Sequence, residues 1–186
     1  MKKFSNNIWK IILGFGVITV LIISFFGYQD IPLGKLKKKY TNSYSSFVKV
    51  GGMDIHYRDQ GDKKDSIPIV LIHGTGSSLH TYDHWTKELI MYHRVIRMDL
   101  PGYGLTGPFP ERDYSYNNYV EFLKVFLEKV GVEKCILAGN SLGGNIAWRF
   151  TIEYSEMMLQ MHILHSSVLA SLSKRYLIPL DTFLTS

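Results

Sequence analysis

A serine between two glycines is the feature of this sequence best suited to chemistry. Gly139, Ser141 and Gly143 form a G-x-S-x-G pattern after the apolar run CILA at 135–138. In a sharp turn from a strand into a helix, such glycines remove side chains that would collide, and the serine oxygen stands clear. The backbone N–H of Leu142, at the helix start, can then face a developing oxyanion. The pattern predicts Ser141 as a nucleophile, with a plain tight turn as the alternative.

A second glycine-rich loop, His73-Gly74-Thr75-Gly76, follows the apolar run IPIVLI at 67–72. Its glycines let backbone amides approach a substrate carbonyl, so we expect Thr75 to be the second oxyanion donor. A phosphate loop is excluded because no lysine follows in the required G-x-x-x-x-G-K-[ST] spacing. We expect the ring of His73 to order the loop, and we set catalysis by His73 aside as the lesser alternative.

A third turn, D-x-P-G-x-G, runs from Asp99 to Gly104. Proline and two glycines force the chain to turn here, and Asp99 is expected to accept hydrogen bonds from nearby backbone amides without being a catalytic acid. The glycines do not lead into a helix, so dinucleotide binding is not indicated.

The sequence implies no metal and no organic cofactor. His80 and His84 are four residues apart on an expected helix, as a metal-binding pair would be. Neither an HExxH glutamate nor a third ligand accompanies them, so a solvated helix face is the preferred interpretation. The single cysteine cannot form an internal disulfide.

These motifs require a framework of alternating strands and helices. A hairpin around Gly51-Gly52 is expected first, and βαβ units with a mostly parallel sheet and flanking helices should follow. The expected strands are 47–50, 55–58, 67–72, 95–98, 135–138 and 161–164, and the expected helices are 79–90, 116–130 and 142–154.

An apolar segment at the front predicts a membrane anchor. Residues 8–26 are nearly all apolar, and Lys10 is their one charge. As a helix they would span roughly 28 Å, close to the hydrocarbon thickness of a bilayer. A cleaved signal peptide is the alternative, but the run is long for one and no A-x-A site follows. We predict a single-pass anchor at 1–30 and a polar stalk at 31–46, with the body on the extracytoplasmic side.

The positive charge belongs to the N-terminal arm. Residues 1–40 carry a net charge of +6, and the remainder carries −1. A body near neutrality argues against nucleic acid as a partner. The stalk lysines are either solvated or rest on anionic head groups. The sequence gives no indication of the oligomeric state.

The three motifs, in this order and spacing, resemble the α/β-hydrolase family from about Phe47 to Leu164. The resemblance implies an α/β fold with a catalytic serine, as in esterases, lipases, C–C bond hydrolases and serine haloperoxidases. Haloalkane dehalogenases and epoxide hydrolases share the neighbouring motifs but have aspartate at the elbow, so Ser141 argues against both. The hydrophobic leader also resembles that of membrane-anchored bacterial members.

The chain departs from the family pattern after Ser141. The family order is serine, then an acid, then histidine, yet no histidine follows Asp181. Glu153 is too far along its helix, and His165 is only a minor candidate for the base. We therefore expect 47–186 to be an incomplete α/β-hydrolase fold, with 166–186 as the start of a cap. Such a piece should expose apolar surface and lack turnover of a p-nitrophenyl ester.

Two functions are consistent with these residues. The first is a membrane-tethered serine hydrolase that acts on a small-molecule ester or related carbonyl substrate by acyl transfer. The second is a non-catalytic, membrane-anchored interaction protein or a fragment without function. An interpretation of the tyrosines at 114, 116 and 119 as a ligand platform ranks below both, because tyrosines at such spacing usually pack around a helix start.

Overall fold

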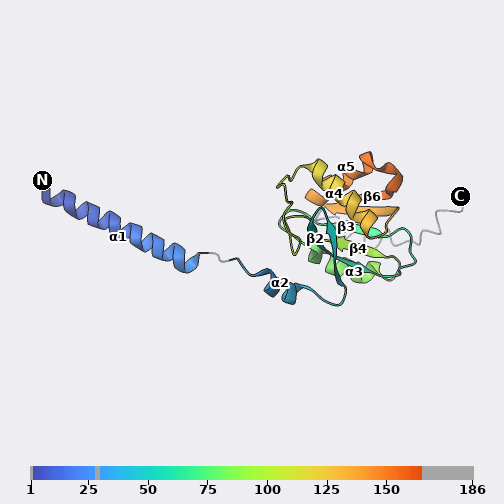
Figure 1. Cartoon of the computed structure of the whole chain (residues 1–186), viewed down its shortest axis with the longest axis horizontal. Coiled ribbons are helices and arrows are strands. Elements are labelled where there is room, and N and C mark those ends of the chain that lie inside the picture. The colour runs from blue at the N-terminus through green and yellow to red at the C-terminus, as the bar shows by residue number, and fades with distance from the viewer. Residues whose placement is uncertain (1, 28–29, 165–186) are drawn as a thin grey trace. The chain divides into compact units, whose positions relative to one another are not determined.

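The computed structural model describes residues 2–27 and 30–164 (Figure 1). The chain divides into two compact units, which meet between residues 38 and 39 of the sequence. The first unit contains the helix α1 (Lys2–Phe26). The helix α2 (Leu33–Tyr40) follows and crosses the division. Residues 8–26, expected to cross the membrane, thus lie within α1, and half of the expected stalk at 31–46 is helical as well.

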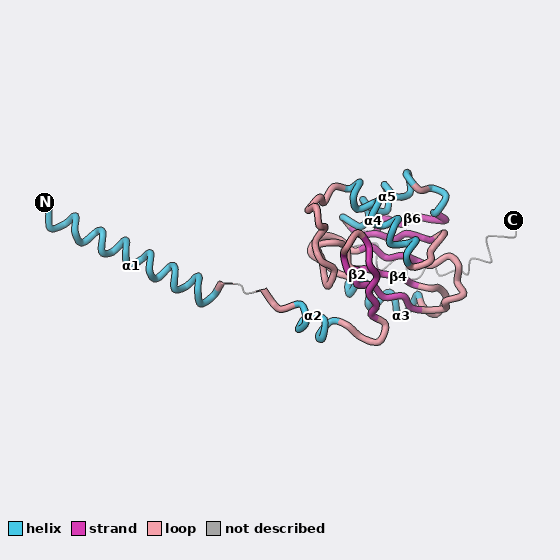
Figure 2. Tube along the Cα trace, viewed as in Figure 1, coloured by secondary structure: helices cyan, strands magenta, loops and turns pink. Residues whose placement is uncertain are grey.

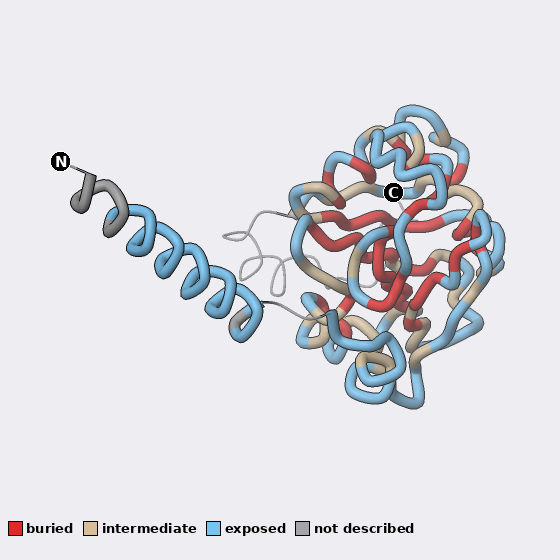
Figure 3. Tube along the Cα trace, turned by 60° about the vertical axis from the view of Figure 1, so that its left-hand side comes forward, coloured by how far each residue is buried: buried red, intermediate tan, exposed pale blue. Residues whose placement is uncertain are grey.

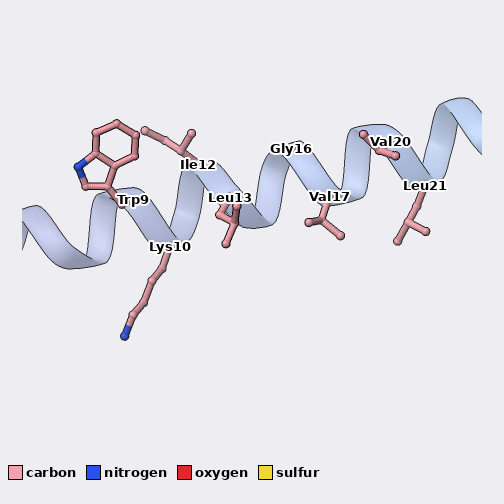
Figure 4. Close-up of a pocket in the computed structure, with 8 residues that line it drawn as sticks. All are labelled: Trp9, Lys10, Ile12, Leu13, Gly16, Val17, Val20 and Leu21. Carbon is pink, nitrogen blue, oxygen red and sulfur yellow. The ribbon is translucent and has the colours of Figure 1, made fainter.

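Helix α1 has an apolar surface that no other part of the described chain covers. Residues Ile8–Phe25 have a mean hydropathy of 2.3, and none of them is buried. Figure 4 shows part of this surface, where Lys10 and apolar side chains around Gly16 line a shallow hollow. A hollow on one side of a single helix is no substrate pocket. The segment is long and apolar enough to cross a bilayer.

The second unit is built on a six-stranded sheet, in the order β1-β2-β4-β3-β5-β6. Strands β1 and β2 form the expected hairpin, β2 pairs antiparallel with β4, and the other pairs are parallel. The mostly parallel sheet is therefore confirmed. The strands are β1 (Ser45–Val50), β2 (Met53–Gln60), β3 (Ile69–Ile72), β4 (Val95–Met98), β5 (Cys135–Asn140) and β6 (Met158–Leu164).

Helices cover both faces of this sheet, as Figures 1 and 2 show. The helices α4 (Tyr116–Lys129) and α5 (Leu142–Glu153) pack on one face over the larger core. A 3-10 turn, η1 (Leu79–Tyr82), and the helix α3 (Asp83–Leu89) pack on the other face, over Leu71 and Val95. A second 3-10 turn, η2 (Ser155–Met157), leads into β6. The central strands are buried between these layers (Figure 3).

Most expected elements differ at their ends by one to three residues. The segment 79–90 is a 3-10 turn followed by a shorter α-helix. Strand β3 begins at Ile69, because Pro68 has no N–H for the ladder and contributes only its carbonyl, to Ile136. Strand β6 begins at Met158, three residues before the expected start.

Helix α4 shows how the sequence sets its own limits. The hydroxyl of Ser115 accepts a hydrogen bond from the N–H of Asn118 and caps the first turn. Gly131, at φ 70°, follows the last turn in the conformation that favours glycine. The buried face between these ends carries Leu123 and Phe126, which are both fully buried.

Candidate active site

Ser141 lies in a strained turn at the carboxyl end of β5, directly before α5. Its φ of 52° and ψ of −113° are rare for a residue with a side chain. Such a conformation costs on the order of 1–3 kcal/mol and persists only where the surroundings impose it. The residue is exposed. The structure therefore has the sharp strand-to-helix bend that the G-x-S-x-G pattern predicts.

Two glycines of the pattern make this bend possible. A Cβ atom on Gly139 would lie 2.2 Å from the carbonyl oxygen of Gly143. A Cβ atom on Gly143 would lie 2.1 Å from the carbonyl oxygen of Ile72, at the end of β3. Neither position tolerates a side chain, so the start of α5 packs directly on the backbone of β3 and β5.

The loop after β3 reaches the same place. A Cβ atom on Gly74 would lie 3.1 Å from the carbonyl oxygen of Asn140 and 3.2 Å from Cβ of Ser141. Gly76 has φ 70° and open space around it, so glycine is favoured there by the backbone conformation of the turn and not by a close neighbour. Thr75 lies between the two glycines and is exposed. The structure thus brings the 73–76 loop and Ser141 together.

Leu142 is the first residue of α5 and is half-buried. The first N–H groups of a helix have no partner within the helix, and they carry the positive end of its dipole. The first hydrogen bond of the helix runs from the N–H of Asn145 to the carbonyl of Ser141, at 3.1 Å, and it does not use the N–H of Leu142. The amide at Leu142 is therefore chemically suited to an oxyanion beside Ser141.

The imidazole of His73 holds the loop and is not poised as a base. It is fully buried; Nδ1 donates to the carbonyl of Gly74 at 2.8 Å, and Nε2 accepts from the N–H of Leu100 at 3.0 Å. The ring of Tyr103 packs edge-on at 5.4 Å. Burial lowers the pKa of His73 and favours the neutral ring. The expected loop-ordering role is confirmed.

Asp99 organises the neighbouring turns. Its Oδ1 accepts from the N–H of Leu79 at 2.8 Å, and its Oδ2 accepts from the N–H of Leu105 at 2.9 Å. A Cβ atom on Gly104 would lie 2.2 Å from this carboxyl group, which explains that glycine of the D-x-P-G-x-G motif. Burial opposes ionisation of Asp99, but these hydrogen bonds and His56 hold its pKa below the usual range. The expected bonding to backbone amides is confirmed.

The sequence analysis missed His56, the side-chain partner of Asp99. His56 is fully buried in β2, and its Nδ1 lies 2.8 Å from Oδ2 of Asp99. Its Nε2 lies 2.9 Å from Oγ of Ser45, at the start of β1. The N–H of Asn42 and Nε of Arg58 also donate to that hydroxyl. The group joins the start of β1 to the turn at Asp99.

Tyr82 was also missed as a support of the site. Its buried hydroxyl donates to the carbonyl of Ile72 at 2.9 Å, the same carbonyl that Gly143 approaches. Burial raises the pKa of Tyr82, so the hydroxyl keeps its proton. A tyrosine at the end of a 3-10 turn gives no local signal for this contact, which joins residues ten positions apart.

Among the residues after Ser141 that could act as an acid or a base, Glu153 and His162 are described in the structure. Glu153 ends α5, at the opposite end from Ser141. His162 lies within β6 in register with Ala138, and burial lowers its pKa. His165 and Asp181 lie outside the described residues, as does the expected cap at 166–186.

The described residues contain no group of three or more histidine, cysteine, aspartate or glutamate side chains that could hold a metal ion. His80, one of the pair four residues apart, has its Nδ1 3.0 Å from Oδ2 of Asp83. That carboxylate also accepts from Nη1 of Arg97, so it belongs to an ion-pair network. Nδ1 of His80 is thus bonded to this network.

Comparison with known proteins defines the class. The sequence model described as "alpha/beta hydrolase fold" matches residues 67–179, more than half of the chain. The chain belongs to the α/β-hydrolase fold family, as the resemblance of its motifs indicated.

Its relatives are hydrolases of different kinds. Epoxide hydrolase 4 of Homo sapiens is 29% identical over 119 residues, which cover 63% of this chain and 33% of that protein. The 2-hydroxy-6-oxo-6-(2'-aminophenyl)hexa-2,4-dienoic acid hydrolase of Metapseudomonas resinovorans is 27% identical over 138 residues, 72% of this chain and 46% of that protein. A crystal structure of the meta-cleavage product hydrolase CumD, in a mutant form, has a TM-score of 0.59 and 28% identity, and it matches 63% of this chain and 43% of that one. The chain therefore spans a third to a half of the length of these relatives.

Proposed function

We propose that the protein is a serine hydrolase that acts by acyl transfer on a small-molecule ester or related carbonyl compound. The strained backbone of Ser141 carries this proposal. Residues in such conformations concentrate at functional sites, because a fold must spend stability to hold them. Here three backbone contacts, at Gly74, Gly139 and Gly143, enforce the conformation around an exposed hydroxyl.

The proposed reaction has two steps. Oγ of Ser141 attacks the substrate carbonyl while a general base takes its proton, and the backbone N–H groups of Leu142 and Thr75 donate to the oxyanion. The base returns the proton to the leaving alcohol, which leaves an acyl-serine. A water molecule, deprotonated by the same base, then releases the acid and restores Ser141. The base of this scheme is a histidine oriented by an acid, as in other serine hydrolases.

A hydroxyl at the elbow favours this chemistry over epoxide opening. A carboxylate nucleophile opens an epoxide by forming an ester that water can cleave, whereas a serine would form an ether that water does not cleave. The chain resembles human epoxide hydrolase 4, but Ser141 supplies the hydroxyl that acyl transfer needs. No metal or organic cofactor takes part in the proposed reaction.

The proposal includes a membrane tether. Helix α1 would cross the bilayer once through residues 8–26 and hold the hydrolase unit on the extracytoplasmic side. Its length and uncovered apolar surface support insertion. Nucleic acid is not a proposed partner, because the basic charge is confined to the N-terminal arm.

A fluorophosphonate probe tests the nucleophile. The full chain in detergent is treated with the probe, and the labelled peptide is identified by mass spectrometry. We expect labelling at Ser141, its loss in Ser141→Ala, and no change in Ser46→Ala, which removes another exposed hydroxyl. Labelling needs a serine that a general base activates beside the oxyanion donors, but it does not need release of the bound group. It therefore tests the site separately from full turnover.

A non-catalytic interaction protein is the second candidate. Apolar side chains are exposed on α5 and β6; Ile152 is 65% exposed and Ile163 is 53% exposed. Large exposed apolar residues that lie together mark contact surfaces. A folded protein in which Ser141 reacts no faster than Ser46 would favour this candidate over the hydrolase.

A further inference from the structure

Helix α2 has two unlike sides. Leu33, Leu36 and Tyr40 recur at the three- and four-residue spacing that places them on one side of a helix. Lys35 and Lys38 fall on the opposite side, and Lys37 and Lys39 lie at the two borders between the sides. No residue of α2 is buried, and Leu33 is 52% exposed. An eight-residue helix of this kind gains little stability from its own sequence.

The charge of α2 is of one sign. Four of its eight residues are lysines, and the sequence contains no aspartate or glutamate between Asp30 and Asp54. The lysine side chains therefore have no acidic neighbour along the chain. A basic stripe beside an apolar stripe is the pattern of helices that lie in the interface of an anionic membrane.

The position of α2 in the chain favours a membrane as its partner. It begins seven residues after Phe26, the last residue of the helix proposed to cross the bilayer. Clusters of four to eight lysines or arginines directly beside a membrane-spanning helix attract anionic lipids. Nucleic acid, which also binds lysines, would require a basic face on the body, whose net charge is −1.

The end of α2 is bonded to the hydrolase unit. Nη2 of Arg58, a buried residue of β2, donates to the carbonyl of Tyr40 at 3.0 Å. The ring of Tyr40 lies 5.8 Å from the ring of His80, between centroids. The same Arg58 donates to Ser45, next to the group of His56 and Asp99. The last residue of α2, Tyr40, is thus hydrogen-bonded to the sheet.

We propose that α2 is a binding site for the head groups of anionic phospholipids and lies in the membrane interface. Its lysines contact the lipid phosphates, while Leu33 and Leu36 face the acyl boundary. The site rests on the proposed insertion of α1.

Spin labels on the full chain test this site. Nanodiscs of zwitterionic lipid are compared with discs that contain about one third anionic lipid. Single cysteines replace Leu33 on the apolar side, Gly34 away from it, and Val17 in α1. A Cβ atom at Gly34 meets nothing within 4 Å, so that substitution fits and retains every lysine. The native Cys135 is buried and stays unlabelled.

Accessibility to oxygen and to a water-soluble relaxant gives the depth of each label. We expect the Leu33→Cys label to enter lipid only in anionic discs, while the Gly34→Cys label remains in water. In anionic discs, the depth of the Leu33→Cys label reports the equilibrium between α2 in water and α2 in the interface. Replacement of the four lysines by glutamine should lower the equilibrium constant for the interface by at least about tenfold, and replacement by arginine should preserve it. Circular dichroism is the control that shows whether these variants retain their helices.

The outcomes separate the two proposals. If the Val17 label lies in lipid but the Leu33 label behaves alike in both discs, the lipid site on α2 is wrong and the anchor stands. If the lysine-to-glutamine variant binds as the parent does, the site is likewise wrong. A Val17 label in water would overturn both the anchor and the site, whereas Ser141 labelling by the fluorophosphonate would be untouched.

Discussion

The α-carbon of Gly143 lies so close to Ile72 that a Cβ atom there would be 2.1 Å from its carbonyl oxygen. It would also be 2.7 Å from the carbonyl oxygen of His73. The start of α5 and the end of β3 are therefore in backbone contact. Ser141 and the loop at 73–76 depend on this contact for their mutual placement.

Substitution of Gly143 by alanine is expected to lower the free energy of unfolding by about 3 kcal/mol, because backbone atoms cannot move aside as a side chain can. Urea unfolding of the full chain in detergent, followed by tryptophan fluorescence, measures the change. Gly107→Ala is the matched control, since a Cβ atom there meets nothing within 4 Å. Equal stability of the two variants would contradict the close contact.

The strain at Ser141 predicts that glycine is more stable there than alanine. Ser141→Gly should unfold with a free energy about 1 kcal/mol above that of Ser141→Ala, because glycine adopts φ 52° without a steric penalty. Both variants lack the hydroxyl, so both should lose fluorophosphonate labelling. A more stable alanine variant would show that the backbone of Ser141 is not strained.

Asp99 should make the free energy of unfolding depend on pH in the acidic range. Its pKa is lower in the folded protein than the ordinary value of 3.8, so its ionised form stabilises the fold. That contribution is complete above pH 3.8 and is lost as the pH falls through the lower, folded pKa. Asp99→Asn should be less stable at neutral pH by about 2–3 kcal/mol, because three donors then face a poorer acceptor. Its stability should fall less steeply in acid, whereas exposed Glu111→Gln should titrate as the parent does.

His73 should add a second, milder dependence. Burial lowers its pKa below 6.5, so the unfolded chain takes up a proton near pH 6.5 that the folded chain refuses. Stability should fall as the pH drops from 6.5 to the folded pKa and should then level off. His73→Gln should be flatter over that range in denaturant titrations. If the free energy of unfolding changed with pH equally in His73→Gln and in the exposed His84→Gln, the role of burial at His73 would be contradicted.

The buried thiol of Cys135 should be inert in the native protein. Burial raises its pKa to about 12, so little thiolate exists at neutral pH. A thiol reagent should modify it only after denaturation, whereas Ser46→Cys should add one fast-reacting thiol. Rapid reaction of native Cys135 would mean that β5 is exposed or opens readily.

The sequence predicted the parts of the fold whose signals are local. The G-x-S-x-G elbow, the loop at 73–76 and the buried strands each depend on neighbouring residues, and the structure contains them at those positions. The break between η1 and α3 was missed because an apolar spacing does not distinguish a 3-10 turn from an α-helix.

Contacts between distant residues could not be predicted. His56 and Asp99 are 43 positions apart, and a histidine in a strand gives no sign of its partner. The link from Tyr40 to Arg58 joins a helix and a strand, and only the pairing of β1 with β2 brings them together. The bend at Ser141 could be predicted because turn chemistry is local, and the proposed base depends on contacts between distant parts of the chain.

The elbow takes its shape from elements that precede β6 in the chain. Gly139 and Gly143 meet each other and Ile72, and Gly74 closes the other side, so β3, β5 and the first turn of α5 suffice to fix Ser141. Strand β6 joins the sheet beyond them, in parallel with β5. A side chain at Gly74, Gly139 or Gly143 would therefore turn the hydroxyl of Ser141 away from its present direction.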